Sequence, residues 1–149
     1  MKEKTSIIPI ACDHGGYELK EFIKMNLLKD GYEIKDFGTD GPESVDYPDF
    51  IHPLAKGVND GVYPLGIIIC GSGNGAQMVA NKYPNVRAAL CWNEEIARLA
   101  RLHNNANILS LPGRFVSKEE GWNMVKVFLE TSFEGGRHQK RVEKINFKF

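Results

Sequence analysis

The sequence carries no excess charge of either sign and few cysteines. Its 149 residues include 19 basic and 19 acidic side chains, so no net electric field favours nucleic acid or an acidic membrane surface as a partner. The cysteines Cys12, Cys70 and Cys91 are odd in number and lack Cys-x-x-Cys spacing. This argues against a disulfide framework or a zinc site and suits a reducing compartment, so we expect a cytoplasmic protein.

Long apolar runs are also missing. No stretch approaches the roughly 18 apolar residues that a membrane helix requires, so we expect no membrane partner. The apolar stretch 7–12 contains Pro9 and runs into Asp13 and His14, which makes it too short and too polar at its end for a signal peptide. We expect one domain over residues 1–149, large enough to bury roughly 68 to 70% of its unfolded surface.

Apolar strands alternate with amphipathic helices along the chain. Predicted strands cover residues 6–12, 32–37, 65–70, 86–91 and 108–111, and predicted helices cover 16–29, 48–59, 74–83, 94–103 and 117–131. Such alternation implies right-handed crossovers. It predicts a three-layer, Rossmann-like α/β sandwich in which a five-stranded parallel sheet has helices on both faces. Proline cannot donate to the ladder, so we expect the first strand to be irregular at Pro9.

Cys70 stands where the third strand meets the glycine-rich turn Gly71-Ser72-Gly73-Asn74-Gly75. The glycines let the backbone turn tightly and bring several N–H groups together at the start of the next helix. An anion, or charge that develops in a transition state, would be stabilised there. The same field favours the thiolate of Cys70 as a base or nucleophile. A buried structural cysteine beside an ordinary turn is the alternative.

Residues that follow the strands should line one cleft, because ligands of open α/β sheets bind beyond the carboxyl ends of the strands. These residues are Asp13 and His14, Tyr47 in the next loop, Cys70 to Gly75, and Arg114 after the fifth strand. A second polar cluster, His103, Asn104, Asn105 and Asn107, ends the fourth helix on the opposite side of the sheet. Helix capping would explain that cluster equally well.

The segment 134–149 forms a basic arm. It places Arg137, His138, Lys140 and Arg141 after the flexible pair Gly135-Gly136. Arg137 and Arg141 are one helical turn apart, so two guanidinium groups would grip one phosphate, although a solvated basic face is the simpler alternative. The double glycine gives the arm freedom to reach a neighbouring subunit.

Seven motifs, in order from about residue 10 to residue 145, resemble the type B ribose-5-phosphate isomerases. That family includes galactose-6-phosphate isomerase subunits and allose-6-phosphate isomerases. The motifs are Ala11-Cys-Asp-His-Gly-Gly16, Asp46-Tyr-Pro48, Cys70-Gly-Ser-Gly-Asn-Gly75, Ala80-Asn-Lys82, Arg87-Ala-Ala89, His103-Asn-x-Ala-Asn107 and Glu134-Gly-Gly-Arg-His-x-x-Arg-Val142. The resemblance implies an aldose–ketose isomerase that interconverts ribose 5-phosphate and ribulose 5-phosphate. It also implies no metal or organic cofactor, and a homodimer or homotetramer with shared active sites.

The resemblance also assigns roles to individual residues. Cys70 would move a proton between C1 and C2 through a cis-enediolate, with the amides of Gly71 to Gly75 and the Ser72 hydroxyl stabilising the oxyanion. In some relatives the base is a glutamate one position past the turn, where this chain has Ala76. His103 would open the furanose ring by acid–base transfer.

The remaining roles concern substrate binding. Asp13 and His14 would contact the sugar or its ring oxygen, Asn104 a hydroxyl, and Tyr47 the ring face. The phosphate would be held by Arg114, Arg137 and Arg141. A partner subunit would supply Arg137, His138 and Arg141 to a cleft that already holds Cys70, His103 and Asp13 of its own subunit. Whether the sugar has five or six carbons stays open.

Two rival functions belong to other classes. Gly71-x-Gly73-x-x-Ala76 satisfies a relaxed dinucleotide fingerprint with acidic residues roughly 20 positions on, but it follows the third strand rather than the first. A cysteine phosphatase would need an arginine that closes the loop, and no residue from 71 to 80 is basic. The isomerase is therefore favoured, with a nucleotide-binding regulatory module next.

Overall fold

The isoleucine run at residues 67–69 forms the buried centre of the sheet. In the computed structural model, which describes residues 6–146, this run belongs to β3 (Gly66–Cys70), a strand that is buried throughout. Because successive side chains of a strand point to opposite faces, Ile67 and Ile69 enter one core while Ile68 and Cys70 enter the other. The prediction that this strand is buried on both faces is thus confirmed. Cys70 points into the same core as Ile68.

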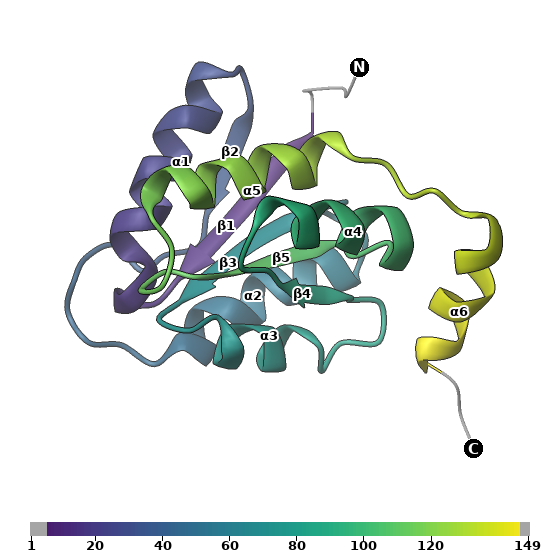
Figure 1. The fold of residues 1–149 in the computed structure, drawn as a ribbon. Helices are drawn as coiled ribbons and strands as arrows, with labels where there is room; N and C mark the ends of the chain where they lie inside the picture. Colours follow the sequence, from purple (N-terminus) through teal and green to yellow (C-terminus); the bar gives the residue numbers. More distant parts are fainter. Residues whose placement is uncertain (1–5, 147–149) are drawn as a thin grey trace.

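Parallel strands flank β3 on both sides, and the strand order is β2-β1-β3-β5-β4 (Figure 1). All four pairings are parallel. The other strands are β1 (Ile7–Cys12), β2 (Glu33–Asp36), β4 (Ala88–Leu90) and β5 (Ile108–Pro112). The order reverses between β1 and β3, and in such sheets ligands bind outside the carboxyl ends of the strands at that reversal.

Helices cover both faces of the sheet, which confirms the three-layer Rossmann-like arrangement. One core packs the sheet against α1 (Tyr17–Lys29), α4 (Glu94–Asn104) and α5 (Lys118–Glu130). The opposite core packs it against α2 (Tyr47–Asn59) and α3 (Asn74–Ala80). Figure 1 shows the two helix layers above and below the sheet. Across residues 6–146, no helix has the length and apolar character needed to cross a membrane.

The first strand is regular at Pro9, which corrects the predicted irregularity. Pro9 lies opposite Lys35 of β2, and pairing with β3 starts only at Ile10, opposite Ile67. Proline is tolerated here because the ladder with β3 begins one residue after it.

The helix after β3 and the following strand are both shorter than predicted. α3 ends at Ala80 rather than residue 83, and β4 covers only residues 88–90. Asn81 links the two elements: its Nδ2 donates to the Ala88 carbonyl at 3.0 Å, and its Oδ1 accepts from the Ala88 N–H at 2.8 Å. The amide side chain therefore covers part of an edge strand that would otherwise present unpaired groups.

The basic arm leaves the end of α5 and folds into a short helix, α6 (Gln139–Glu143), between 3-10 turns at Gly136–His138 and Lys144–Asn146. It contacts the rest of the protein at few points. The Glu134 N–H donates to the Leu102 carbonyl at 3.0 Å, and Asn146 donates to the Pro84 carbonyl. In Figure 1, α6 lies at the far end of the sheet from the carboxyl ends of the strands.

A buried ion pair joins α1 to β2. The Lys20 side chain is fully buried, and its Nζ lies 2.6 Å from Asp36 Oδ2, which also accepts from Lys24 at 2.6 Å. Partial burial would raise the pKa of Asp36, but the hydrogen bonds from both lysines and from the Gly38 N–H outweigh it and lower that pKa. Removing one partner of such a pair leaves an uncompensated buried charge.

We expect Asp36→Asn to lower the free energy of unfolding by about 3 kcal/mol, because buried Lys20 keeps its charge beside only the exposed carboxylate of Glu21, 3.2 Å away. Urea titration at pH 7 measures this loss. The control is Asp60→Asn, which removes the exposed Lys56–Asp60 pair and should cost much less. Because the folded-state pKa of Asp36 is lowered, its contribution is complete above its unfolded pKa of about 3.9 and disappears as pH falls through the folded value. An equal loss for both variants would contradict the burial argument.

Candidate active site

The crevice between the ends of β1 and β3 is formed by backbone contacts around Asp13. The Asp13 N–H donates to the Ile69 carbonyl at 3.2 Å, and its carboxylate accepts from the Gly15 N–H at 2.9 Å. The aspartate is only 7% exposed, so its position is defined by these contacts. The Asp13 side chain therefore lies where the strand order reverses, which is the position predicted for it from the sequence.

Cys70 ends β3 beside the same crevice. It is 4% exposed and belongs to the core formed with α2 and α3. Its carbonyl accepts from the Gly113 N–H at 2.9 Å, and the Gly71 carbonyl accepts from the Arg114 N–H at 3.0 Å. Pairing with β5 thus continues past Pro112, and this continuation carries Arg114 to the glycine turn.

The glycine turn is shaped by close neighbours. Gly73 has φ +79°, and a Cβ there would lie 2.4 Å from Leu90 Cδ1. A Cβ at Gly75 would lie 2.4 Å from Cζ of Tyr47. The Tyr47 ring, from the first residue of α2 rather than the predicted loop, therefore lies directly against the turn.

Two hydroxyl groups brace this turn. Ser110 Oγ donates to the Gly73 carbonyl at 2.8 Å within the buried interior. Ser72 Oγ accepts from the Asn74 N–H at 3.2 Å, and its own hydrogen remains able to donate to an oxyanion. The turn thus has a defined shape and a hydroxyl donor of the kind that stabilises developing negative charge.

Arg114 adds positive charge at the rim, where His14 also lies. A Cβ at Gly71 would lie 3.2 Å from Nη1 of Arg114, so the guanidinium lies over the start of the turn. His14 Nδ1 accepts from the Val45 N–H at 3.2 Å, which assigns the proton of the neutral ring to Nε2. Both residues line a cavity of about 480 Å³ together with Lys118. The lining carries two cations, Arg114 and Lys118, and one carboxylate, Glu18, so its net charge favours an anionic group.

The structure therefore brings together most of the predicted residues at the carboxyl edge of the sheet. We call this set the cysteine half-site. It consists of Asp13, His14, Tyr47, Cys70, Gly71, Ser72, Gly73, Asn74, Gly75 and Arg114.

The remaining predicted residues lie at the opposite edge. α4 starts after β4, at the carboxyl edge of the sheet, and extends about 16 Å toward the opposite edge, at 1.5 Å per residue. His103 and Asn104 in its last turn stand near Asn107, whose carbonyl accepts from the Gly66 N–H at the start of β3. The structure thus does not bring His103 beside Cys70 within one chain, which corrects the expectation that one subunit supplies both to the cleft. We call His103, Asn104, Arg137, His138 and Arg141 the histidine half-site.

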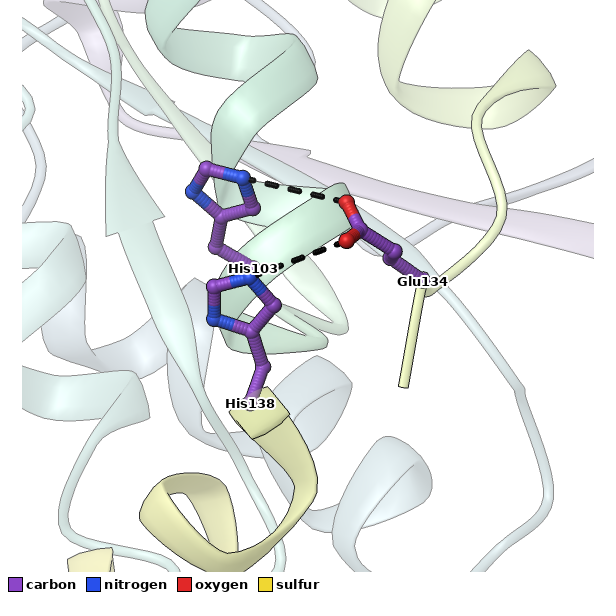
Figure 2. Close-up of side chains that lie close together, drawn as sticks. All are labelled: His103, Glu134 and His138. Atoms are coloured by element: carbon purple, nitrogen blue, oxygen red, sulfur yellow. Dashed lines mark ion pairs between the residues drawn. The ribbon is translucent and has the colours of Figure 1, made fainter. Parts of the chain in front are cut away.

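The histidine half-site centres on two stacked rings (Figure 2). The centroids of His103 and His138 are 4.2 Å apart with 16° between the ring planes. Glu134 Oε1 lies 3.9 Å from His103 Nε2, and Oε2 lies 4.0 Å from His138 Nε2. Desolvation, and then the nearby charges of His103, Arg137 and Arg141, lower the pKa of His138 despite Glu134. Arg137 and Arg141 themselves are exposed.

Sequence reasoning assigned no role to Glu134, although it named the segment that contains it. The i to i+4 spacing of Glu134 and His138 was the available signal. The asparagines beside His103 fit the capping alternative: Asn105 adopts φ +47° as the C-cap of α4, and Asn107 Oδ1 accepts from the Arg87 N–H at 2.7 Å.

Cys12 and Cys91 are fully buried, whereas Cys70 is 4% exposed at the end of β3, and this difference predicts selective labelling of Cys70. Burial raises the pKa of Cys12 and of Cys91 to about 12, so at pH 8 only about one molecule in ten thousand carries either thiolate. We expect iodoacetamide to modify Cys70 at least tenfold faster than the other two in the folded protein, as measured by peptide mass spectrometry. All three should react in guanidinium. Equal rates in the folded state would contradict this assignment.

Comparison with known proteins places this arrangement in one family. The Ribose/Galactose Isomerase family model matches residues 8–145. Ribose-5-phosphate isomerase B of Escherichia coli is 41% identical over 138 residues, which cover 93% of each chain. A crystal structure of a ribose 5-phosphate isomerase from Thermotoga maritima superposes with a TM-score of 0.92 at 48% identity and covers 95% of this chain and 97% of that one.

A structure of ribose-5-phosphate isomerase B from Mycoplasma genitalium, with bound ribulose-5-phosphate, superposes with a TM-score of 0.90 at 44% identity. It covers 94% of this chain and 93% of that chain. The family model matches nearly all of the described residues. The chain belongs to the ribose/galactose isomerase family.

Proposed function

We propose that this chain is an aldose–ketose isomerase that interconverts D-ribose 5-phosphate and D-ribulose 5-phosphate. The observation that carries the proposal is the position of Cys70, at the end of β3 beside the glycine turn and Asp13. The relative from Mycoplasma genitalium with bound ribulose-5-phosphate supports the choice of substrate. Three free thiols suit a reducing compartment, which supports a cytoplasmic location.

In this proposal Cys70 is the base of the isomerisation step. Its thiolate takes the proton from C2 of the open-chain aldose, and the electron pair of that bond forms the C1–C2 double bond of the cis-enediolate. The charge on O1 is stabilised by the N–H groups of the glycine turn and by the Ser72 hydroxyl. The proton then returns to C1 while the hydroxyl proton moves from O2 to O1, which completes the ketose.

His103 acts before this step, on the closed sugar. One imidazole nitrogen accepts the proton of the anomeric hydroxyl as the bond between C1 and the ring oxygen breaks, and the imidazolium then gives that proton to the ring oxygen. Histidine suits this exchange because its unperturbed pKa of about 6.5 lies near neutral pH. In the proposal Asp13 and His14 contact the sugar, Asn104 a hydroxyl and Tyr47 the ring face.

The separation of the two half-sites supports an active site shared between subunits. We place Cys70, Asp13 and Arg114 of one subunit against His103, Asn104, Arg137, His138 and Arg141 of a second, in a homodimer or homotetramer. Isologous contacts in a two-fold dimer then build two equivalent sites. In this arrangement the subunit that contributes the basic arm also contributes His103, because the His103 ring packs on His138. The subunit that contributes Cys70 does not.

A six-carbon sugar phosphate is the second candidate substrate. The family description, which names galactose beside ribose, favours testing it. Parallel assays with ribose 5-phosphate, allose 6-phosphate and galactose 6-phosphate decide between them. We expect the highest kcat/KM for ribose 5-phosphate.

Cys70→Ala should abolish isomerisation while the fold remains, because only the proton-transfer group is removed. The coupled assay should fall below a hundredth of wild type, and solvent deuterium should no longer enter C1 or C2. The control is Cys91→Ala, which changes a buried thiol of the opposite core and should keep most of the activity. More than a tenth of wild-type turnover in Cys70→Ala would assign the base to another residue.

Subunit mixing tests the shared site. Inactive Cys70→Ala subunits mixed with inactive His103→Asn subunits, or with Arg137→Ala/Arg141→Ala subunits, should recover about a quarter of wild-type activity, because each mixed dimer holds one intact site. The control pairs Cys70→Ala with His14→Ala, two changes in the cysteine half-site, and should recover nothing. If mass spectrometry confirms exchange and no pairing of opposite half-sites regains activity, each site belongs to one chain.

A further inference from the structure

Three side chains with metal-binding atoms converge at the amino edge of the sheet. His103 comes from the last turn of α4, while Glu134 and His138 come from the start of the basic arm (Figure 2). One ligand atom from each lies within 4.8 Å of the other two. Each oxygen of Glu134 faces a different imidazole, at 3.9 Å and 4.0 Å from the two Nε2 atoms.

His138 presents an unsatisfied nitrogen to this cluster. Its side chain is only 8% exposed, and its Nε2 is buried without a hydrogen-bond partner in the structure. A buried polar atom without a partner is unfavourable, because the hydrogen bonds it made to water are lost. The nitrogen is directed at Glu134, so a ligand between them would satisfy the nitrogen and the carboxylate together.

The donor set fits a transition-metal ion such as zinc. Two imidazole nitrogens and one carboxylate oxygen form the ligand set of zinc sites that keep a fourth position open. Magnesium and calcium prefer sites made of oxygen atoms, so they match these residues poorly. We propose that His103, Glu134 and His138 form a zinc-binding site, with one ion bound per chain.

Binding requires a small rearrangement. Zinc binds nitrogen at about 2.0–2.1 Å, so neighbouring ligand atoms of a tetrahedral ion are about 3.4 Å apart. The Glu134 oxygens and the two Nε2 atoms must therefore move closer together. The two rings also lie nearly parallel at 16°, whereas both lone pairs must point at one ion. His103 is the ligand that tilts, because its side chain is 37% exposed whereas that of His138 is 8% exposed.

The consequence for catalysis rests on the proposed function. Zinc on Nε2 of His103 occupies one of the two ring nitrogens available for proton transfer in the ring-opening step. The bound ion therefore acts as a reversible inhibitor and not as a cofactor. The cysteine half-site contributes no ligand, so zinc binding itself does not depend on the isomerase assignment.

Isothermal titration of the metal-free full chain with zinc chloride tests the site directly. We expect one ion per chain, with affinity at least tenfold weaker in Glu134→Gln and in His138→Gln. The matched control is Glu143→Gln, another exposed glutamate of the arm, which should bind within twofold of wild type. Magnesium chloride should produce no saturable heat. Cobalt adds a second readout, because a four-coordinate site gives a visible absorption band that Glu134→Gln should lose.

Several outcomes would overturn the proposal. These are absence of saturable zinc binding, unchanged affinity in Glu134→Gln, and loss of binding in Cys70→Ala, which would make the thiol the ligand. Circular dichroism establishes that each variant is folded. With ribose 5-phosphate, zinc should inhibit the wild type and EDTA should restore activity. Binding without any isomerase activity would refute the proposed function and leave the zinc site intact.

Discussion

The direction of α4 is the constraint on which the rest of the site depends. Parallel strands bring their carboxyl ends to one edge of the sheet, so each following helix must return to the other edge before the next strand. Cys70 ends a strand, whereas His103 ends a returning helix. Residues with these two positions cannot meet in one chain of this fold. A site that uses both therefore needs two chains, and symmetry supplies two such sites at once.

The charges of the two half-sites are complementary to a phosphorylated substrate. Arg114 and Lys118 line the cavity beside His14, and Arg137 and Arg141 are exposed on the arm. Bringing these cations together without an anion is unfavourable, because like charges repel more strongly as water is excluded. A sugar phosphate between the half-sites would neutralise them, since guanidinium groups pair well with phosphate oxygens. Substrate binding and the approach of the half-sites should therefore be coupled.

Much of the fold was predictable from the sequence, because strand and helix periodicities are local signals. The isoleucine run, the glycine turn and the polar residues after the strands all predicted the cysteine half-site. Contacts between distant elements were not predictable. The Tyr47 ring against Gly75, the burial of Lys20 beside Asp36 and the stack of His103 on His138 depend on how layers pack. The regularity of β1 at Pro9 likewise depends on where its pairing with β3 begins.

A crystal structure with bound ribose 5-phosphate tests the shared site most directly. We expect C1 and C2 of the sugar to lie within van der Waals contact of Cys70 Sγ in one chain, and the phosphate oxygens to bind Arg137 and Arg141 of a second chain. His103 beside the ring oxygen should belong to that second chain. A sugar phosphate bound by Cys70, His103 and Arg137 of the same chain would contradict the account.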